Sequence, residues 1–372
     1  MRSIKLIATG DLVLEKRLRE TPTLERPEVQ SELARLRSAD LVLVNLEQPL
    51  SSRGVQTDKW AALRGIPGIA LDVAEMGVDV VTIANNHMSD YGPEALADTL
   101  SLLDQAGVAH CGAGVNVTQA MAPTILERKG WTIGVLGVAS TLPIGSAATD
   151  DRPGVAPVRV TATYELDPRI AAEQPGMVPI AHTSLDPSDT ARLVDAIRTL
   201  RPRADYLIVS IHWGVPSFWM TPYGGLLAEY QRTLGHAMID AGADLVHGHH
   251  PHEPHGVELY RGKLICYSLG NYIFAPPREF MSPEAYLVEV ALSEDRGAGV
   301  ALRPIWINEA GLPSTPNSEQ HGRIASTLIR LSKPLGVAFV PGEDGTLLPI
   351  PSEGHTQDAT GARQDAGRLP QT

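Results

Sequence analysis

Several apolar segments of strand length in this chain run directly into side chains that can bind metals or move protons. These segments alternate with stretches of helical periodicity, a pattern that predicts an α/β fold. We expect the strand ends to lie along one edge of the sheet, where open α/β sheets build their sites. The polar groups that follow the segments are Asp11, Glu47, Asn86 with His87, His212, and the cluster His249, His250 and His252.

The same periodicity bounds the expected elements and domains. Strands are expected over 4–9, 41–45, 78–84, 133–138, 206–211 and 245–247, a hairpin over 257–260 and 263–268, and helices over 29–36, 93–106 and 226–241. We interpret 1–350 as a single domain with a proline-rich insertion at about 141–186. Such long insertions are typical of lids, binding elements or disordered loops. The polar segment 351–372 is expected to be a disordered tail.

Histidine is concentrated in one place, because five of the 12 histidines lie between residues 247 and 255. Neutral imidazole is the commonest metal ligand in proteins. Since side chains alternate along an extended segment, His250 and His252 are expected to face the site and His249 to point away. His247 and His255 are then expected behind the ligands or at the surface. The alternative interpretation is a solvated polar loop.

Composition limits the partners and the compartment. The 372 residues carry a net charge of −12, which argues against nucleic acid and anionic membranes as partners. The two cysteines, Cys111 and Cys266, form no cluster, which argues against a thiolate zinc site and favours a reducing cytoplasm. With no long apolar leader and no run of about 18 apolar residues, we expect a cytoplasmic protein without a membrane anchor. The oligomeric state is left open.

Six short motifs carry a resemblance to a known family. They are Gly10-Asp11, Asn45-Leu46-Glu47-Gln48-Pro49-Leu50, Ala84-Asn85-Asn86-His87 with Asp90-Tyr91-Gly92, His212-Trp213-Gly214, Gly248-His249-His250-Pro251-His252 and Tyr267-Ser268-Leu269-Gly270-Asn271-Tyr272. In this order, over roughly 4–275, they resemble the CapA-like family. That family is named for poly-γ-glutamate capsule synthesis and belongs to the calcineurin-like metallophosphoesterase superfamily.

The resemblance implies a fold and a site. The implied fold is α/β, of calcineurin-like type, with a central β-sandwich flanked by helices. The implied metal centre is lined by Asp11, Glu47, Asn86, His212, His250 and His252. His87 would be the acid/base imidazole, paired with a carboxylate. Carboxylate, amide and imidazole together suit one or two divalent ions such as Mn²⁺, Fe²⁺, Zn²⁺ or Ca²⁺.

This chain departs from its wider superfamily at two places. Asn-Leu-Glu stands where the dinuclear phosphatases have a second aspartate motif, so one metal is as consistent as two. Beside His212 the chain is rich in aromatic residues, although only 5% of all its residues are aromatic. These side chains indicate either a pocket for an apolar or aromatic substrate group or a packed loop, and they are Trp213, Phe218, Trp219 and Tyr223.

Three functions fit these features. The hypothesis we favour from sequence is a peptide epimerase, as in soluble CapA-like relatives that invert the C-terminal residue of a lasso-peptide precursor. His–Asp pairs would move the Cα proton, with His87 and Asp90 as one pair and Asp11 with His250, His252 or His212 as the other. The alternative is a metal-dependent phosphoesterase, hydrolase or capsule biosynthesis protein. A non-catalytic scaffold for polymer assembly is the third.

Overall fold

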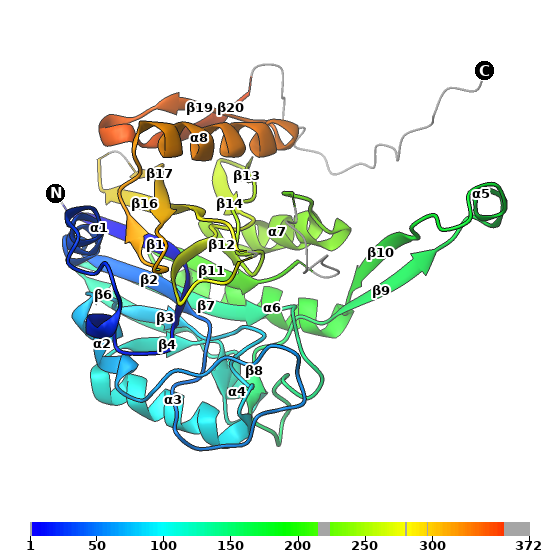
Figure 1. Cartoon of the computed structure of the whole chain (residues 1–372), viewed down its shortest axis with the longest axis horizontal. Coiled ribbons are helices and arrows are strands. Elements are labelled where there is room, and N and C mark those ends of the chain that lie inside the picture. The colour runs from blue at the N-terminus through cyan, green and yellow to red at the C-terminus, as the bar shows by residue number, and fades with distance from the viewer. Residues whose placement is uncertain (1, 215–223, 280, 296, 353–372) are drawn as a thin grey trace.

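Two mixed β-sheets pack face to face, and helices cover their outer faces (Figure 1). The computed structural model describes residues 2–214, 224–279, 281–295 and 297–352. The central β-sandwich flanked by helices, predicted from the family resemblance, is confirmed.

The first sheet has a parallel centre and an antiparallel flank. Strands β1 to β4 run parallel, while β16, β17 and β20 add antiparallel partners on the other side of β1. The strand order is β19-β20-β17-β16-β1-β2-β3-β4, with β15 on β1 and β18 on β17. The bounds are β1 Ser3–Leu14, β2 Leu41–Leu46, β3 Val80–Thr82, β4 Ala109–Cys111, β15 Asn271–Ala275, β16 Glu284–Ser293, β17 Gly297–Ile307, β18 Pro313–Ser314, β19 Val337–Pro341 and β20 Leu347–Pro351.

The second sheet repeats this design with the order β13-β14-β12-β11-β7-β6. Its four central strands are parallel, and each edge strand is antiparallel. The bounds are β6 Thr124–Arg128, β7 Trp131–Ala139, β11 Tyr206–His212, β12 Leu245–His249, β13 Val257–Tyr260 and β14 Lys263–Cys266. A separate short pair joins β5 Ala113–Gly114 to β8 Gly154–Val155.

Alternation along the strands builds three apolar layers. On β1, Leu6 and Ala8 pack between the sheets against Val135 and Ile208, whereas Ile7 faces the helices. Each such fully buried aliphatic side chain contributes roughly 1.5–3 kcal/mol to stability. Helices α1 to α3 cover the first sheet, α6 and α7 cover the second, and α8 packs against the layer between them. The bounds are α1 Pro27–Arg37, α2 Ile69–Glu75, α3 Gly92–Ala106, α4 Val117–Ala120, α6 Pro187–Leu200, α7 Glu229–Ala241 and α8 Ser318–Ser332, with 3₁₀ turns at Leu18–Glu20, Arg201–Arg203, Lys333–Leu335 and Glu343–Gly345.

A two-stranded arm projects from this body (Figure 1). It consists of β9 Val160–Glu165, a short helix α5 Pro168–Glu173 at its tip, and β10 Ile180–Leu185. The arm contacts helix α7 through Glu229. His182 lies 3.2 Å from a carboxylate oxygen of Glu229, which also accepts a hydrogen bond from the Thr183 backbone amide. The arm falls within the segment predicted as an insertion, and that domain division stays a prediction.

Several expected boundaries differ from the structure, among them the strand expected over 78–84, which is β3 Val80–Thr82. The first strand does not end near Thr9 but continues to Leu14, because its second half pairs with β15. Pro351, assigned from sequence to the tail, closes β20 opposite Val337. Residues 353–372 of the predicted tail lie outside the described residues.

Candidate metal centre and acid/base site

The ends of strands from both sheets meet at one point. Glu47 follows β2, His212 closes β11, and His249 closes β12. Asp11 joins them from a register break within β1, opposite Asn271. The polar strand ends that the sequence analysis expected to converge therefore do so, although Asp11 lies inside a strand.

Two glycines allow this close approach. A Cβ on Gly10 would lie 2.0 Å from the Gly270 carbonyl oxygen, and one on Gly248 would lie 2.3 Å from that of Cys266. No side chain fits at such distances, so a larger residue would push the Asp11 segment away from Gly270, or the His249 segment away from Cys266.

Carboxylates and imidazoles form two overlapping groups. In one, Oε1 of Glu47 lies 3.2 Å from Nε2 of His212, which lies 3.1 Å from Nδ1 of His250. In the other, Nδ1 of His252 lies 3.4 Å from Oδ2 of Asp11, and its Nε2 lies 3.6 Å from Oε1 of Glu47. Within each group, one ligand atom per residue lies within 4.8 Å of the others, a spacing that suits a shared cation.

Several potential metal-ligand atoms in these two groups have no hydrogen-bond partner among the described residues. Oδ2 of Asp11 and both carboxylate oxygens of Glu47 are buried without a hydrogen-bond partner. Buried oxygens of this kind are costly unless a proton or cation compensates them. His252 donates from Nδ1 to Oδ1 of Asn271 at 2.9 Å, which leaves Nε2 as the atom that would bind a metal in place of its proton. A divalent cation fits this set.

His249 gives independent support for a cation. His247 donates from Nε2 to the Thr9 carbonyl at 2.7 Å, so its Nδ1 can accept from Nε2 of His249 at 3.0 Å. Nδ1 of His249 then presents a lone pair 2.8 Å from Oδ1 of Asp11, with no hydrogen bond between them. A nearby cation would offset this contact between two acceptor atoms.

Burial and the charges of neighbouring side chains shift the pKa values of the clustered residues in different directions. Burial raises the pKa of Glu47, and the neighbouring Asp11 charge adds to the effect. Burial would also raise the pKa of Asp11, but His249 and His252 hold it well below its usual range. Desolvation lowers the pKa of His250 to about 3. Desolvation opposes charge on His252 too, but Glu47 and Asp11 raise its pKa to about 9.

Beside the cluster lies the predicted imidazole–carboxylate pair. Nδ1 of His87 lies 2.6 Å from Oδ2 of Asp90, and both side chains are buried. Asp90 also accepts a 2.7 Å hydrogen bond from Nζ of Lys59, which itself lies 3.1 Å from Nδ1 of His87. Burial, opposed by Asp90 and aided by the Lys59 charge, lowers the pKa of His87. The pair therefore holds a neutral imidazole whose Nε2 can accept a proton.

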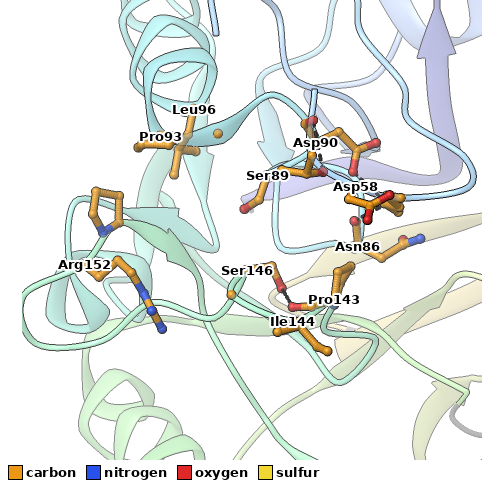
Figure 2. A pocket seen from close by; sticks show the side chains of 15 residues that line it. Asp58, Asn86, Ser89, Asp90, Pro93, Leu96, Pro143, Ile144, Ser146 and Arg152 are labelled. Atoms are coloured by element: carbon orange, nitrogen blue, oxygen red, sulfur yellow. Dashed lines mark hydrogen bonds and ion pairs between the residues drawn. The ribbon is translucent and has the colours of Figure 1, made fainter. Parts of the chain in front are cut away.

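A cavity of about 430 Å³ opens next to this pair. Lys59, Asn86 and Asp90 line it together with residues of the loop 143–153. Figure 2 shows Asn86 and Asp90 across the cavity from Arg152. Oδ1 of Asn86 is buried without a hydrogen-bond partner, so it suits a cation or a donor on a substrate. Its predicted role as a metal ligand stays a prediction.

The expectation for His249 was wrong. His249 does not point away from the site, because β12 ends there and the chain turns at His250 and His252, which have φ values of 107° and 56°. Strict alternation stops where the strand stops. For His247 and His255 the expectation left two places open, and both residues are buried, with His247 behind His249.

A further correction concerns Trp213, one of the aromatic residues predicted to bind substrate. Trp213 is fully buried, donates from Nε1 to the Tyr267 carbonyl at 2.8 Å, and stacks on that ring. It is a core residue and does not line the cavity. The other predicted substrate-binding residues, Phe218, Trp219 and Tyr223, lie outside the described residues.

Three residues outside the predicted set of site residues also shape the site. Asn45 donates to Asp11 at 2.8 Å, Asn271 orients His252, and Lys59 bonds Asp90. Asn45 and Asn271 lie within the quoted motifs, so their position at strand ends was a usable signal. Lys59 lies in a loop without periodic pattern.

A family model describes most of this chain. The model for the bacterial capsule synthesis protein PGA_cap matches residues 5–276. The chain belongs to this family. The resemblance to CapA-like proteins is thereby confirmed, whereas membership of its lasso-peptide epimerase branch stays a prediction.

Three proteins that are similar in sequence to this chain have names that refer to capsule or polymer synthesis. The chain is 30% identical over 277 residues to the PGA biosynthesis protein CapA of Bacillus subtilis, covering 74% of this chain and 63% of that one. It is 28% identical over 299 residues to the capsule biosynthesis protein CapA of Bacillus anthracis, covering 79% and 65%. It is 28% identical over 327 residues to a probable polyglutamine synthesis accessory protein of Mycobacterium tuberculosis, covering 85% and 78%. The chain thus spans less than two thirds of either Bacillus protein.

Solved structures show only a distant likeness. A hypothetical protein from Thermus thermophilus aligns with a TM-score of 0.41 at 18% identity, covering 81% of this chain and 98% of that one. A putative 5′-nucleotidase from Staphylococcus aureus aligns with a TM-score of 0.44 at 14% identity, covering 85% and 55%. Among the described helices, none has the length and apolar character needed to cross a membrane.

Proposed function

We propose that this chain is a metal-dependent hydrolase that acts on γ-glutamyl polymer. The observation that carries the proposal is the neutral, Asp90-held imidazole of His87 beside a cluster whose buried carboxylate oxygens lack partners. The names of the relatives supply the substrate class. They favour the capsule-type alternative over the epimerase hypothesis, which the comparisons do not support.

The residues suggest how an amide bond would be opened. Asp11, Glu47, His212, His250 and His252 would hold the cation. When bound, the cation would polarise the scissile carbonyl and lower the pKa of a water molecule towards about 7. His87 would take the proton of the attacking water at Nε2 and return it to the leaving amine nitrogen as the C–N bond breaks. Water is consumed, and one carboxyl and one amine terminus form.

Asp90 and Lys59 act through His87. Asp90 accepts a hydrogen bond from Nδ1–H of His87, which fixes the tautomer and directs Nε2 outward. Lys59 lies against both groups, and its charge disfavours a long-lived imidazolium. A base that is neutral at rest and protonated only during turnover fits this arrangement.

The test is incubation of the purified full chain with poly-γ-glutamate and Mn²⁺ or Zn²⁺. We expect shorter polymer by size-exclusion chromatography and new amine termini by fluorescamine labelling, both lost in His87→Ala. Phosphate release from an aryl phosphate without polymer cleavage would overturn the proposal and indicate a phosphoesterase instead. Deuterium uptake at one Cα of a peptide in heavy water, without cleavage, would restore the epimerase hypothesis. The expected cytoplasmic location stays a prediction from sequence.

A further inference from the structure

The cavity beside His87 carries two opposite charges on its rim. Arg152, from the loop 143–153, and Asp58, from the loop before Lys59, both line it. Figure 2 shows Arg152 across the cavity from Asp58 and Asn86. Neither charged side chain has an ion pair or hydrogen bond within the part of the chain that the structure describes. Both therefore remain free to bind a ligand.

Lys59 cannot replace Arg152 as the cation for a ligand. Its Nζ donates to the Asn86 carbonyl at 2.6 Å and to Asp90 at 2.7 Å, and it lies against the His87 ring. Those contacts direct it towards the protein. Arg152 is thus the cation of the cavity lining that is not already paired within the described residues.

Much of the rest of the cavity lining is apolar. Its apolar residues are Pro93, Leu96, Pro143, Ile144 and Pro153, beside the polar Thr57, Ser89 and Ser146. A ligand that fits this surface has an anionic group at one end, a short apolar stem, and a hydrogen-bond donor at the other. A γ-linked glutamyl residue has this pattern, with an α-carboxylate, two methylene groups and amide N–H groups in the polymer chain. A phosphate ester offers the anion but no N–H donor.

We propose that this cavity is a binding subsite for one γ-linked glutamyl residue, with Arg152 holding its α-carboxylate and Asp58 accepting a chain N–H. The inference rests on the proposed function for its substrate class. It goes further in naming the recognised group and the residue that selects it. Guanidinium–carboxylate pairs are often bidentate, which makes this contact selective for a free carboxylate.

The test measures binding, so that it does not depend on turnover. Calorimetry would compare the full chain with Arg152→Ala, using a γ-linked glutamate trimer and its analogue with all α-carboxylates capped as amides. We expect the capped trimer and the Arg152→Ala change each to weaken binding by about tenfold, and the two effects not to add. Arg152→Lys should recover only part of the loss. Arg169→Ala is the matched control, because Arg169 lies on the projecting arm and pairs with Asp167.

Equal binding of both trimers, or unchanged affinity in Arg152→Ala, would overturn the subsite. This failure differs from failure of the proposed function. Arg152-dependent binding without polymer cleavage would support the subsite while removing the hydrolase proposal. Cleavage with an unchanged KM in Arg152→Ala would remove the subsite and leave the hydrolase intact.

Discussion

Nδ1 of His249 lies 2.8 Å from Oδ1 of Asp11, which joins the last residue of β12 in one sheet to the bulged centre of β1 in the other. The contact lies between the two sheets, so the site exists only when the sandwich is closed. Metal binding at this point therefore couples to global stability, because the unfolded chain has no preformed cluster.

We expect a divalent cation to stabilise the protein and a chelator to remove that effect. At a free metal concentration about 100 times Kd, linkage predicts a gain of about 2.7 kcal/mol. Thermal denaturation with Mn²⁺ or Zn²⁺ would measure it as a rise in Tm. Glu47→Gln should lose most of the rise, yet be at least as stable as the native chain without metal, because the cost of burying its charge, the largest effect on its pKa, is gone.

A matched control for that experiment is Glu32→Gln. Glu32 is equally buried, but it bonds Arg35 and Thr315 and has no place in the cluster. Its variant should keep the full response of Tm to metal. Loss of the response in both variants would point to a general effect of removing a buried carboxylate.

Asp90→Asn should lower kcat by about 10- to 100-fold with little change in KM, the size typical of a residue that orients an imidazole. The amide can still accept a hydrogen bond from the Leu63 amide, so the loop should persist. Turnover of whichever substrate the assays identify would measure the loss. Asp98→Asn, which removes a partner of Arg53, is the control and should leave kcat unchanged. Equal losses in the two variants would contradict a specific role for Asp90.

Trp213→Ala should destabilise the fold by about 3–5 kcal/mol, because it empties a fully buried site and leaves the Tyr267 carbonyl without its donor. Denaturant unfolding would measure the change. The control is Trp60→Ala, since Trp60 is 68% exposed. This variant should lower the free energy of unfolding by under about 1 kcal/mol. A stable Trp213→Ala variant with a raised KM would instead indicate that Trp213 binds substrate.

The attachment of the arm should weaken as pH rises. Glu229 and Glu165, on either side of the exposed His182 ring, raise its pKa above 6.5. A raised pKa means that the protonated ring stabilises the folded arm, fully below about pH 6.5 and progressively less as pH passes the folded value. Amide exchange of residues 160–185, corrected for its intrinsic pH dependence, should therefore show less protection at pH 8 than at pH 6. His182→Gln should show low protection at both, and a pH response that survives this change would exclude His182 as its source.

Much of the architecture could be predicted because its signals are local. Apolar segments of strand length located β2, β7, β11 and β12 to within a few residues, since each buries both faces in a layered fold. Polar residues after such segments predicted Glu47 and His212, because parallel strands bring their carboxyl ends to one edge. His87 and Asp90, three residues apart, were predicted as a pair because a single turn connects them.

What the sequence by itself determined was therefore the layered class, the family and the set of side chains available for chemistry. Only the tertiary structure decided how those side chains point. Asp11 faces the cluster because β15 extends β1 past a register break, and His249 faces Asp11 because β12 ends before the pattern of alternation can continue. Lys59 and Arg152 joined the site from loops, where no periodicity exists and position follows from packing against distant segments. Contacts between residues far apart in the chain set these orientations, and a local pattern contains no information about them.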